Sequence, residues 1–420
     1  MKKLISLLLV LAMVLGGLAG CSNSGKPEGG DQPVVEDKVK IGIILVGDEN
    51  EGYTYAHMLG IQQAAKALGM DDSQIIWKYT VGEDQKCYDA AVDLVEQGCK
   101  AVFSNSYGHQ SYMQLAASEY PDVTFVACTG DTAAISGLAN FSNAFTNVYE
   151  SRYVSGVVAG MKLAELIANN QLKPENYDED GNVKIGYVGA YTYAEVISGF
   201  TAFYLGVKSV VENVKMYVTY TGSWFSIDDE ASAANSLVKT QNCVIIGQHA
   251  DSTGAPSEVE ALSANGYTAF SVGYNIDMLT AAPTVALTSA TNNWGVYYTY
   301  AFNQVLKGEK VATDWAEGYE TGTVAITELG PNCAAGTAEK VEEVIAALKA
   351  GTLHVFDTSK WTLNGEHLTE LKIDLDGDFA TDHDADKNAI YDGYFHESEF
   401  RSAPSFNVII DGIVNLNEKY

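Results

Sequence analysis

Polar and aromatic side chains gather in five clusters, each of which follows an apolar run typical of a β-strand. The clusters are GDENEGYTYAH at residues 47–57, SNSYGHQ at 104–110, TGSWFS at 221–226, GQHAD at 247–251 and GYNIDM at 273–278. Facing aromatic rings can hold a flat heterocycle, since stacking is worth about 1–3 kcal/mol per base. Carboxylates beside them can accept hydrogen bonds from sugar hydroxyls, worth about 1.5–3 kcal/mol each. A nucleoside offers both features.

A single one of these clusters would not by itself indicate a ligand-binding site. An isolated aromatic residue more often packs in the interior, and an isolated aspartate more often caps a helix or lies in a solvated turn. Five clusters at successive strand ends change this balance, because open α/β sheets bind ligands beyond the carboxyl ends of their strands. We therefore predict a binding site at these strand ends.

An enzyme is one alternative, because three of the clusters contain a histidine: His57, His109 and His249. Neither G-x-S-x-G nor H-E-x-x-H occurs in the sequence, so the hydrolase and metalloprotease templates fail. His249 and Asp251 would bind a metal only as part of a larger set, and we favour hydrogen bonding to the ligand or the backbone. We expect a binding protein with no catalytic residue, no metal and no cofactor.

Alternating aspartates in DLDGDFATDHDADKN, residues 374–388, resemble a calcium-binding loop. The match is poor, because Lys387 stands where an EF-hand needs glycine and Gly393 stands where it needs a bidentate glutamate. We favour a solvated acidic loop.

Charge and size exclude other classes of protein. The 420 residues include 25 Lys and Arg against 54 Asp and Glu, for a formal net charge of −29. This deficit leaves no basic field for a phosphate backbone, so nucleic acid is not expected as a partner. With 47% hydrophobic residues the chain has the composition of a folded protein, and its length favours two domains.

The N-terminus has the pattern of an exported lipoprotein. Two lysines precede an apolar run at residues 4–15, which is shorter than the roughly 20 residues needed to span a bilayer. The LAGC that ends at Cys21 resembles the bacterial lipobox. We expect a signal peptide at residues 1–20, lipid on Cys21, a flexible tether over 21–37, and anchorage on the outer face of the bacterial cytoplasmic membrane. Secretion without a lipid is the alternative.

The other cysteines are odd in number and lack the C-x-x-C spacing of metal or redox sites. We interpret them as small buried apolar residues, with one disulfide pair left open because export permits disulfides. They are Cys87, Cys99, Cys128, Cys243 and Cys333.

Apolar, β-branched runs alternate with stretches in which apolar residues recur at helical spacing. This alternation predicts a parallel sheet covered by helices on both faces. The pattern restarts at residues 184–189 after the polar insert at 169–182, so a second lobe and a cleft between the lobes are expected. The expected strands are residues 39–46, 75–79, 101–104, 123–128 and 141–146 in the first lobe, and 184–189, 216–220, 243–248 and 268–273 in the second.

Longer segments carry a recognisable pattern in a fixed order. They are VGDENEGYTYAHMLGIQQAAKALG at 46–69, YPDVTF at 120–125, RYVSGVVAGM at 152–161, KIGYVGAYTYAEVISGFTAFYLGV at 184–207, AAPTVALTSATNNWG at 281–295 and GTLHVF at 351–356. Together with the clusters, they resemble the basic membrane protein family of substrate-binding lipoproteins of ABC importers, whose characterised members look like purine nucleoside receptors. The likeness runs from about residue 38 to residue 356.

The resemblance implies which rings would hold the base. Tyr53 stands where the family often has a Trp or Phe that stacks on the base, and Thr54 replaces an asparagine that is common there. Trp224 would supply the opposing ring from the second lobe, with Phe225 as the alternative if the register differs by one.

The resemblance also implies polar contacts to the ligand. Asp251 and Asp277 match these contacts, with ribose hydroxyls expected for at least one of them, and Asn50 and Tyr107 are further candidates. Some relatives carry a lysine after LTS, and this chain does not, so that contact is absent or is replaced by Asn292.

The implied fold is an α/β type I periplasmic-binding-protein fold, with two Rossmann-like lobes, a hinge and an interlobe cleft. Lobe one would contain residues 38–148 and 275–311, lobe two 149–274 and 312–370, and the remainder, 371–420, would be a C-terminal extension. A monomer would close on a nucleoside and present it to an ABC transporter permease without chemistry. A receptor of the same fold for a sugar or a small signalling molecule is the alternative, and a nucleoside hydrolase-type enzyme is less favoured.

Overall fold

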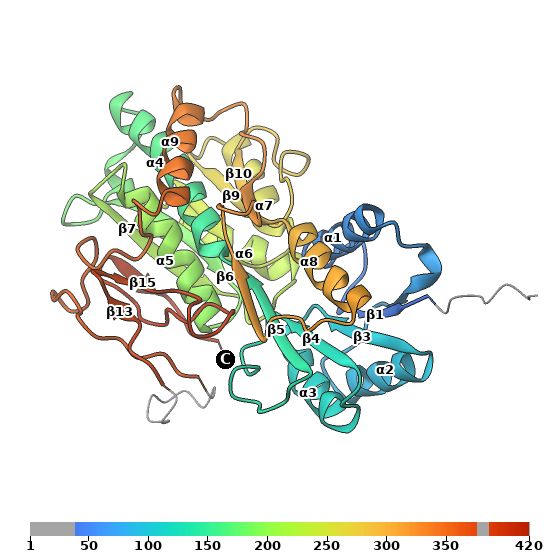
Figure 1. Ribbon diagram of the computed structural model, residues 1–420. Coiled ribbons are helices and arrows are strands. Elements are labelled where there is room, and N and C mark those ends of the chain that lie inside the picture. The colour runs from blue at the N-terminus through green and yellow to red at the C-terminus, as the bar shows by residue number, and fades with distance from the viewer. Residues whose placement is uncertain (1–37, 376–385, 420) are drawn as a thin grey trace, which may run out of the picture. The chain divides into compact units, whose positions relative to one another are not determined.

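The computed structural model describes residues 38–375 and 386–419. The expected signal peptide, Cys21 and the tether lie outside the described residues, as does most of the acidic run that resembles a calcium loop. Within the described ranges, no helix is both long enough and apolar enough to cross a membrane. The chain from Val39 onward forms one compact unit, and this unit contains two large sheets (Figure 1).

The first sheet consists of parallel strands, and its four inner strands are buried for most of their length. Apolar runs of this kind are typical of strands covered on both faces. Two helices pack on each face: α1 (Gly52–Leu68) and α8 (Trp294–Lys307) on one, α2 (Gln85–Glu96) and α3 (Gln110–Glu119) on the other. The strand order is β11 (Asp314–Glu317), β5 (Phe141–Thr146), β4 (Thr124–Cys128), β3 (Cys99–Ser104), β1 (Lys40–Ile44) and β2 (Ile75–Lys78).

The second sheet repeats this plan, with β12 as an antiparallel strand at one edge. One face is covered by α4 (Val148–Ala168) and α5 (Ala194–Lys208), the other by α6 (Ile227–Lys239) and α7 (Gly254–Ala264), while α9 (Thr337–Lys349) packs on α4. The strand order is β12 (Val324–Ile326), β10 (Ala286–Asn292), β9 (Phe270–Tyr274), β8 (Ile245–Gln248), β6 (Val183–Gly189), β7 (Val214–Tyr220) and β15 (Ile413–Asn415).

Helix α1 shows how local sequence sets these elements. Glu51 precedes it, and its carboxylate accepts a hydrogen bond from the Thr54 N–H, which would otherwise lack a partner in the first turn. Gly69 ends the helix with φ 65°, a left-handed conformation that glycine adopts without steric cost. The apolar stripe between them includes Met58 and Ile61, which are buried against the first sheet. The strand end and the helix start are therefore joined by a short acidic turn.

The described chain passes between the two sheets after β5, after β10 and after β11. This corrects the expected lobe boundaries at residues 275 and 312. β10 pairs with β9 in the second sheet, so the chain leaves that sheet near Asn293, and β11 pairs with β5 in the first sheet. Neither β10 nor β11 is among the strands expected from the sequence, and the alternation of strands and helices does not say which sheet a strand joins.

The last described segment is not a loose extension. Its strand β15 pairs in parallel with β7 at the edge of the second sheet, and β13 (Ile390–Tyr391) and β14 (Tyr394–Phe395) form a hairpin. The Asn417 side chain hydrogen-bonds both the N–H and the carbonyl oxygen of Tyr220. Figure 1 shows this red segment beside α5. Residues far apart in sequence therefore complete one sheet.

The five described cysteines are free thiols. Cys87, Cys99, Cys128 and Cys243 are buried, which confirms their interpretation as small apolar residues, and Cys333 is half-buried. The disulfide left open by the sequence does not form among them.

Candidate functional site

A cavity of about 220 Å³ lies where the carboxyl ends of strands from both sheets meet. From the first sheet it is lined by residues that follow β1, β2, β3 and β4, and from the second by residues that follow β6, β7 and β8, with Tyr274 at the end of β9. This is where open parallel sheets place ligands, because the loops there carry free backbone and polar groups. All five sequence clusters contribute polar or aromatic side chains to it, the fifth through Tyr274.

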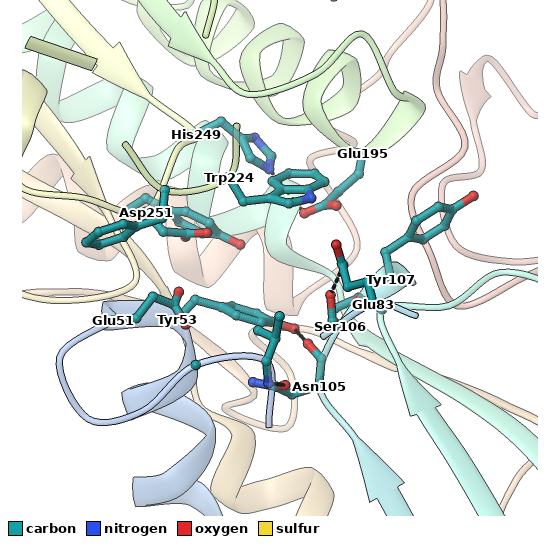
Figure 2. Close-up of a pocket in the computed structure, with 15 residues that line it drawn as sticks. Glu51, Tyr53, Glu83, Asn105, Ser106, Tyr107, Glu195, Trp224, His249 and Asp251 are labelled. Carbon is teal, nitrogen blue, oxygen red and sulfur yellow. Dashed lines mark hydrogen bonds and ion pairs between the residues drawn. The ribbon is translucent and has the colours of Figure 1, made fainter. Parts of the chain in front are cut away.

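Two aromatic rings lie on opposite sides of the cavity. Figure 2 shows Trp224, from the loop after β7, above the space and Tyr53, from the first turn of α1, below it. The Tyr53 hydroxyl donates to the carbonyl oxygen of Asn105, which fixes the ring. Trp224 packs edge-on against Tyr191, with ring centroids 5.2 Å apart. A planar group between Tyr53 and Trp224 would contact a ring on each face.

Further rings surround this pair. Tyr107, Phe225 and Tyr274 also line the cavity. Phe225 is 41% exposed, so it lies at the mouth. Tyr274 is buried, and the Arg152 guanidinium lies 3.5 Å from the centre of its ring. The cavity is therefore walled chiefly by aromatic carbon, which favours an apolar, flat group.

Four carboxylates line the same cavity: Glu51, Glu83, Glu195 and Asp251. Glu83 accepts from the hydroxyl of Ser106, and the remaining three are bonded to separate partners. Among the described residues, no lysine or arginine lines the cavity. The site therefore repels anions and favours groups that donate hydrogen bonds or carry positive charge.

Asp251 is the most deeply buried of these acids. Its carboxylate accepts from the Asn275 side chain at 2.7 Å, and its N–H donates to the Trp224 carbonyl oxygen at 2.8 Å. Burial raises the pKa of Asp251 well above its usual value, and the negative charges of Glu51 and other acids add to this shift. Burial also raises the pKa of Glu51, against hydrogen bonds from Thr54 that lower it. The proton occupancy of this end of the cavity therefore depends on pH.

His249 lies within hydrogen-bond distance of Glu195, and its lowered pKa keeps the imidazole neutral. The two side chains approach to 3.1 Å, and burial followed by the Arg152 charge lowers the pKa of His249 to about 4. Arg152 donates to the Gln248 carbonyl oxygen at 2.6 Å and to the Tyr187 hydroxyl at 3.0 Å. This buried cation therefore lies behind the aromatic wall, where it opposes the charge of the acids without entering the cavity.

Two lining or supporting residues adopt a left-handed backbone. Thr129 has φ 67° and Asn275 has φ 61°, although only asparagine tolerates this region well. Such a conformation costs on the order of 1–3 kcal/mol for a β-branched residue. Thr129 follows β4 and lines the cavity, while Asn275 follows β9 and its side chain donates a hydrogen bond to Asp251. Both left-handed turns therefore lie at strand ends beside the cavity, one in each lobe.

The predicted site residues divide into two groups. Tyr53, Tyr107, Trp224, Phe225 and Asp251 all line the cavity.

The other predicted residues do not line the cavity. Thr54 is fully buried beneath it and accepts from the Asn105 amide at 3.2 Å. Asn50 is exposed and hydrogen-bonds Asp48, and the Asp277 carboxylate accepts from the Leu279 N–H at 2.8 Å in an exposed turn. Asn292, named as a replacement contact, is likewise absent from the lining and bonds Asn275 instead.

Several lining residues were not predicted. Asn105 and Ser106 precede Tyr107 in its cluster, and Glu195 follows β6 in the segment AYTYAE. The same strand-end rule, applied to β6, would have identified Glu195. Glu83 has no such signal, because it stands in a charged turn after β2 that resembles any solvated loop.

In the described part of the chain, no group of three or more His, Cys, Asp or Glu side chains is arranged to hold a metal ion. His249 and Asp251 both line the cavity, but each is bonded to another side chain.

Comparison with known proteins points in the same direction. Residues 38–350 match the family described as ABC transporter substrate-binding protein PnrA-like. A purine-binding protein of Brucella abortus is 30% identical over 362 residues, which cover 84% of this chain and 93% of that relative. A Haloferax volcanii protein, provisionally named an ABC transporter glucose-binding protein, is 28% identical over 72% of this chain and 69% of its own.

A solved ABC transporter solute-binding protein of Aeropyrum pernix K1 shares the architecture. Its TM-score is 0.62 at 15% identity, covering 78% of this chain and 94% of that chain. Similarity at this level concerns the fold, and it confirms the expected type I periplasmic-binding-protein fold. The family consists of binding proteins rather than enzymes, which confirms that expectation as well. On the family match and the 30% identical relative, this chain belongs to the PnrA-like family of ABC transporter substrate-binding proteins.

Proposed function

We propose that this substrate-binding protein captures a purine nucleoside between Tyr53 and Trp224 and delivers it to the permease of an ABC importer. The observation that carries the proposal is the pair of rings on opposite sides of a cavity that also holds four carboxylates. The purine-binding relative from Brucella abortus supports a purine rather than another flat ring.

The charges of the cavity favour a nucleoside over a nucleotide. Four carboxylates line it, and the nearby Arg152 is held behind the wall by Gln248 and Tyr187. A phosphate would have to approach these acids with no cation to receive it, whereas the N–H and O–H groups of a nucleoside can donate to them. Ionised Asp251 would accept such a bond.

Capture would work through closure. A ligand that contacts Tyr53 on the first lobe and Trp224 on the second stabilises arrangements in which both are near, and a permease can distinguish these from the open form. No bond is made or broken. The described chain would act as a monomer.

A sugar is the second candidate for the ligand. The Haloferax volcanii relative is named for glucose, and aromatic rings with carboxylates also suit sugar faces. A small signalling molecule would have to bind in the same cavity, and none of the lining side chains favours it over a nucleoside or a sugar.

We further propose that lipid on Cys21 anchors the protein to the outer face of the bacterial cytoplasmic membrane. The supporting pattern is the short apolar leader followed by LAGC.

A ligand panel should separate these candidates. We expect calorimetry to give heats of binding with inosine, guanosine or adenosine, and none with cytidine, ribose, glucose, galactose or inosine monophosphate. The rings favour a purine base, and the carboxylates disfavour the phosphate of a nucleotide. Binding of glucose alone would establish the sugar alternative and refute the nucleoside.

Replacement of Trp224 by alanine should weaken nucleoside binding roughly 10- to 100-fold, because one stacking face is lost. Titration calorimetry with the preferred nucleoside measures the change, and Trp224→Phe should retain most of the affinity. The matched control is Tyr79→Ala, since Tyr79 is 43% exposed and does not line the cavity. Equal affinities for Trp224→Ala and the native chain would mean that the rings have been misassigned.

Nucleoside affinity should fall as the pH decreases through the raised pKa of Asp251, by up to about tenfold per pH unit. The sign follows because the ionised carboxylate is a stronger acceptor of the ligand's hydrogen bond than its protonated form is. Asp251→Asn should bind weakly at all pH values and lose most of this dependence, whereas Asp228→Asn, at an exposed position of α6, should behave as the native chain does. A flat pH profile for the native chain would contradict this role.

Cys21→Ser should release the protein from the membrane fraction into the surrounding fluid, as immunoblots of fractionated cells would show. The lipid requires the Cys21 thiol, so the change removes the anchor and leaves the folded part intact. Cys333→Ser is the control and should remain bound to the membrane. Retention of the Cys21→Ser variant on membranes would refute the anchor.

A further inference from the structure

A second cavity, of about 310 Å³, adjoins the first. The two share three lining residues, Tyr107, Thr129 and Glu195. The far wall of the second cavity comes from the C-terminal segment, which contributes Arg401, Ser405, Asn407, Asn415 and Glu418 among others. This segment lies beyond residue 350, where the match to the family ends.

The C-terminal wall is held by both sheets. The backbone N–H and the hydroxyl of Ser402 donate to Asp314 on β11 of the first sheet, at 2.8 and 3.0 Å. Arg401 lies 3.5 Å from Asp131, which follows β4 of the same sheet. On the other side, β15 pairs with β7, and Lys419 exchanges hydrogen bonds with Thr192. The wall is therefore a built part of the molecule.

The two cavities differ in chemistry. The first is walled by rings, and its four carboxylates already have hydrogen-bond partners. The second is lined by hydroxyl and amide groups from Thr129, Thr192, Ser405, Asn407 and Asn415. Asn407 is exposed, and its amide makes no hydrogen bond within the described part of the chain. Amides both donate and accept, which suits the hydroxyl groups of a sugar.

Charge excludes a phosphate from the second cavity as well. Its lining includes four carboxylates, those of Asp131, Glu195, Asp374 and Glu418, against the single guanidinium of Arg401. That guanidinium is already engaged, since it donates to Asp131 and to the carbonyl oxygens of Asp374 and Pro404. A neutral, hydroxylated group therefore fits better than an anionic one.

The geometry also sets the direction of the ligand. Figure 2 shows Glu51 and Asp251 at one end of the first cavity and Glu195 with Tyr107 at the other. Only the second pair also lines the second cavity. The first cavity alone, at about 220 Å³, is smaller than the roughly 300–1,000 Å³ of ordinary ligand sites, and the adjoining space supplies the difference.

We propose that the two cavities form one ligand site with two compartments, in which the rings hold the base and the compartment built by the C-terminal segment holds the sugar. This inference rests on the proposed function, because it takes the ligand to be a nucleoside. It assigns Asp251 to the edge of the base and Glu195 and Asn407 to the sugar, whereas the family resemblance implies a ribose contact for at least one of Asp251 and Asp277.

The test compares a base with its nucleoside on the full chain. Calorimetry would measure hypoxanthine and inosine with the native protein, Asn407→Ala and Asn407→Trp. Because Asn407 is exposed, both variants should fold, as unchanged melting curves would confirm. We expect Asn407→Ala to weaken inosine binding about 3- to 10-fold, since a hydrogen bond is lost, and Asn407→Trp to weaken it more. Hypoxanthine affinity should change less than twofold in both.

The matched control is Asn213→Trp. Asn213 is exposed and immediately precedes the first residue of β7, at the end of the strand away from the cavity, so the change should leave both affinities unchanged. Equal losses for hypoxanthine and inosine, or no loss for either, would overturn the two-compartment site while leaving nucleoside capture in place. A native chain that binds neither compound would overturn the proposed function and this inference together.

Discussion

Parallel strands from both sheets end at one cavity, and this shared direction places the binding groups together. A parallel strand needs a crossover before its neighbour, so each strand end opens into a loop on the same edge of the sheet. β1, β3 and β4 deliver Tyr53, Tyr107 and Thr129 in this way, and β7 and β8 deliver Trp224 and Asp251. The chemistry can therefore vary within the loops while the sheets stay unchanged.

The burial of several acids is the main electrostatic cost of this arrangement. Asp251 and Glu51 would be more stable in water, as their raised pKa values indicate. Arg152 reduces the cost from behind Tyr274, at 3.5 Å from its ring, and Asn275 contributes a direct hydrogen bond to Asp251. Arg152 and Asn275 do not offset the whole cost of burying these carboxylates. A ligand that donates hydrogen bonds to them would lower the remaining cost, and this gain would contribute to its affinity.

Local pattern predicted much of the fold and part of the site. Many of the strands and helices follow from periodicity. The clusters that contain Tyr53 and Trp224 follow from their places after strands, and the choice of these two rings follows from the family resemblance. Asp277 looked equivalent to Asp251, but its carboxylate closes a turn on Leu279, and only the backbone conformation reveals this. β15 pairs with β7 across almost two hundred residues, a contact that no periodicity contains. The sequence analysis expected no strand at β10 and placed its residues in the first lobe, whereas β10 pairs with β9 in the second sheet, and pairing is a property of the assembled chain.

The three crossings and the C-terminal segment connect the two sheets, so they couple lobe closure to the shape of the second cavity. Asn147 and Asn293, at the first two crossings, donate backbone hydrogen bonds of 2.7 Å to Glu317 and Thr323, which flank the third. Burial raises the pKa of Glu150 to about 7, and its carboxylate accepts from the Tyr319 N–H at the same place. Any rotation of one sheet relative to the other must therefore have its hinge in these hydrogen-bonded crossing segments. Because Ser402 is tied to Asp314 while β15 is tied to β7, the same motion also changes the second cavity, so a group held there would influence the closed state directly.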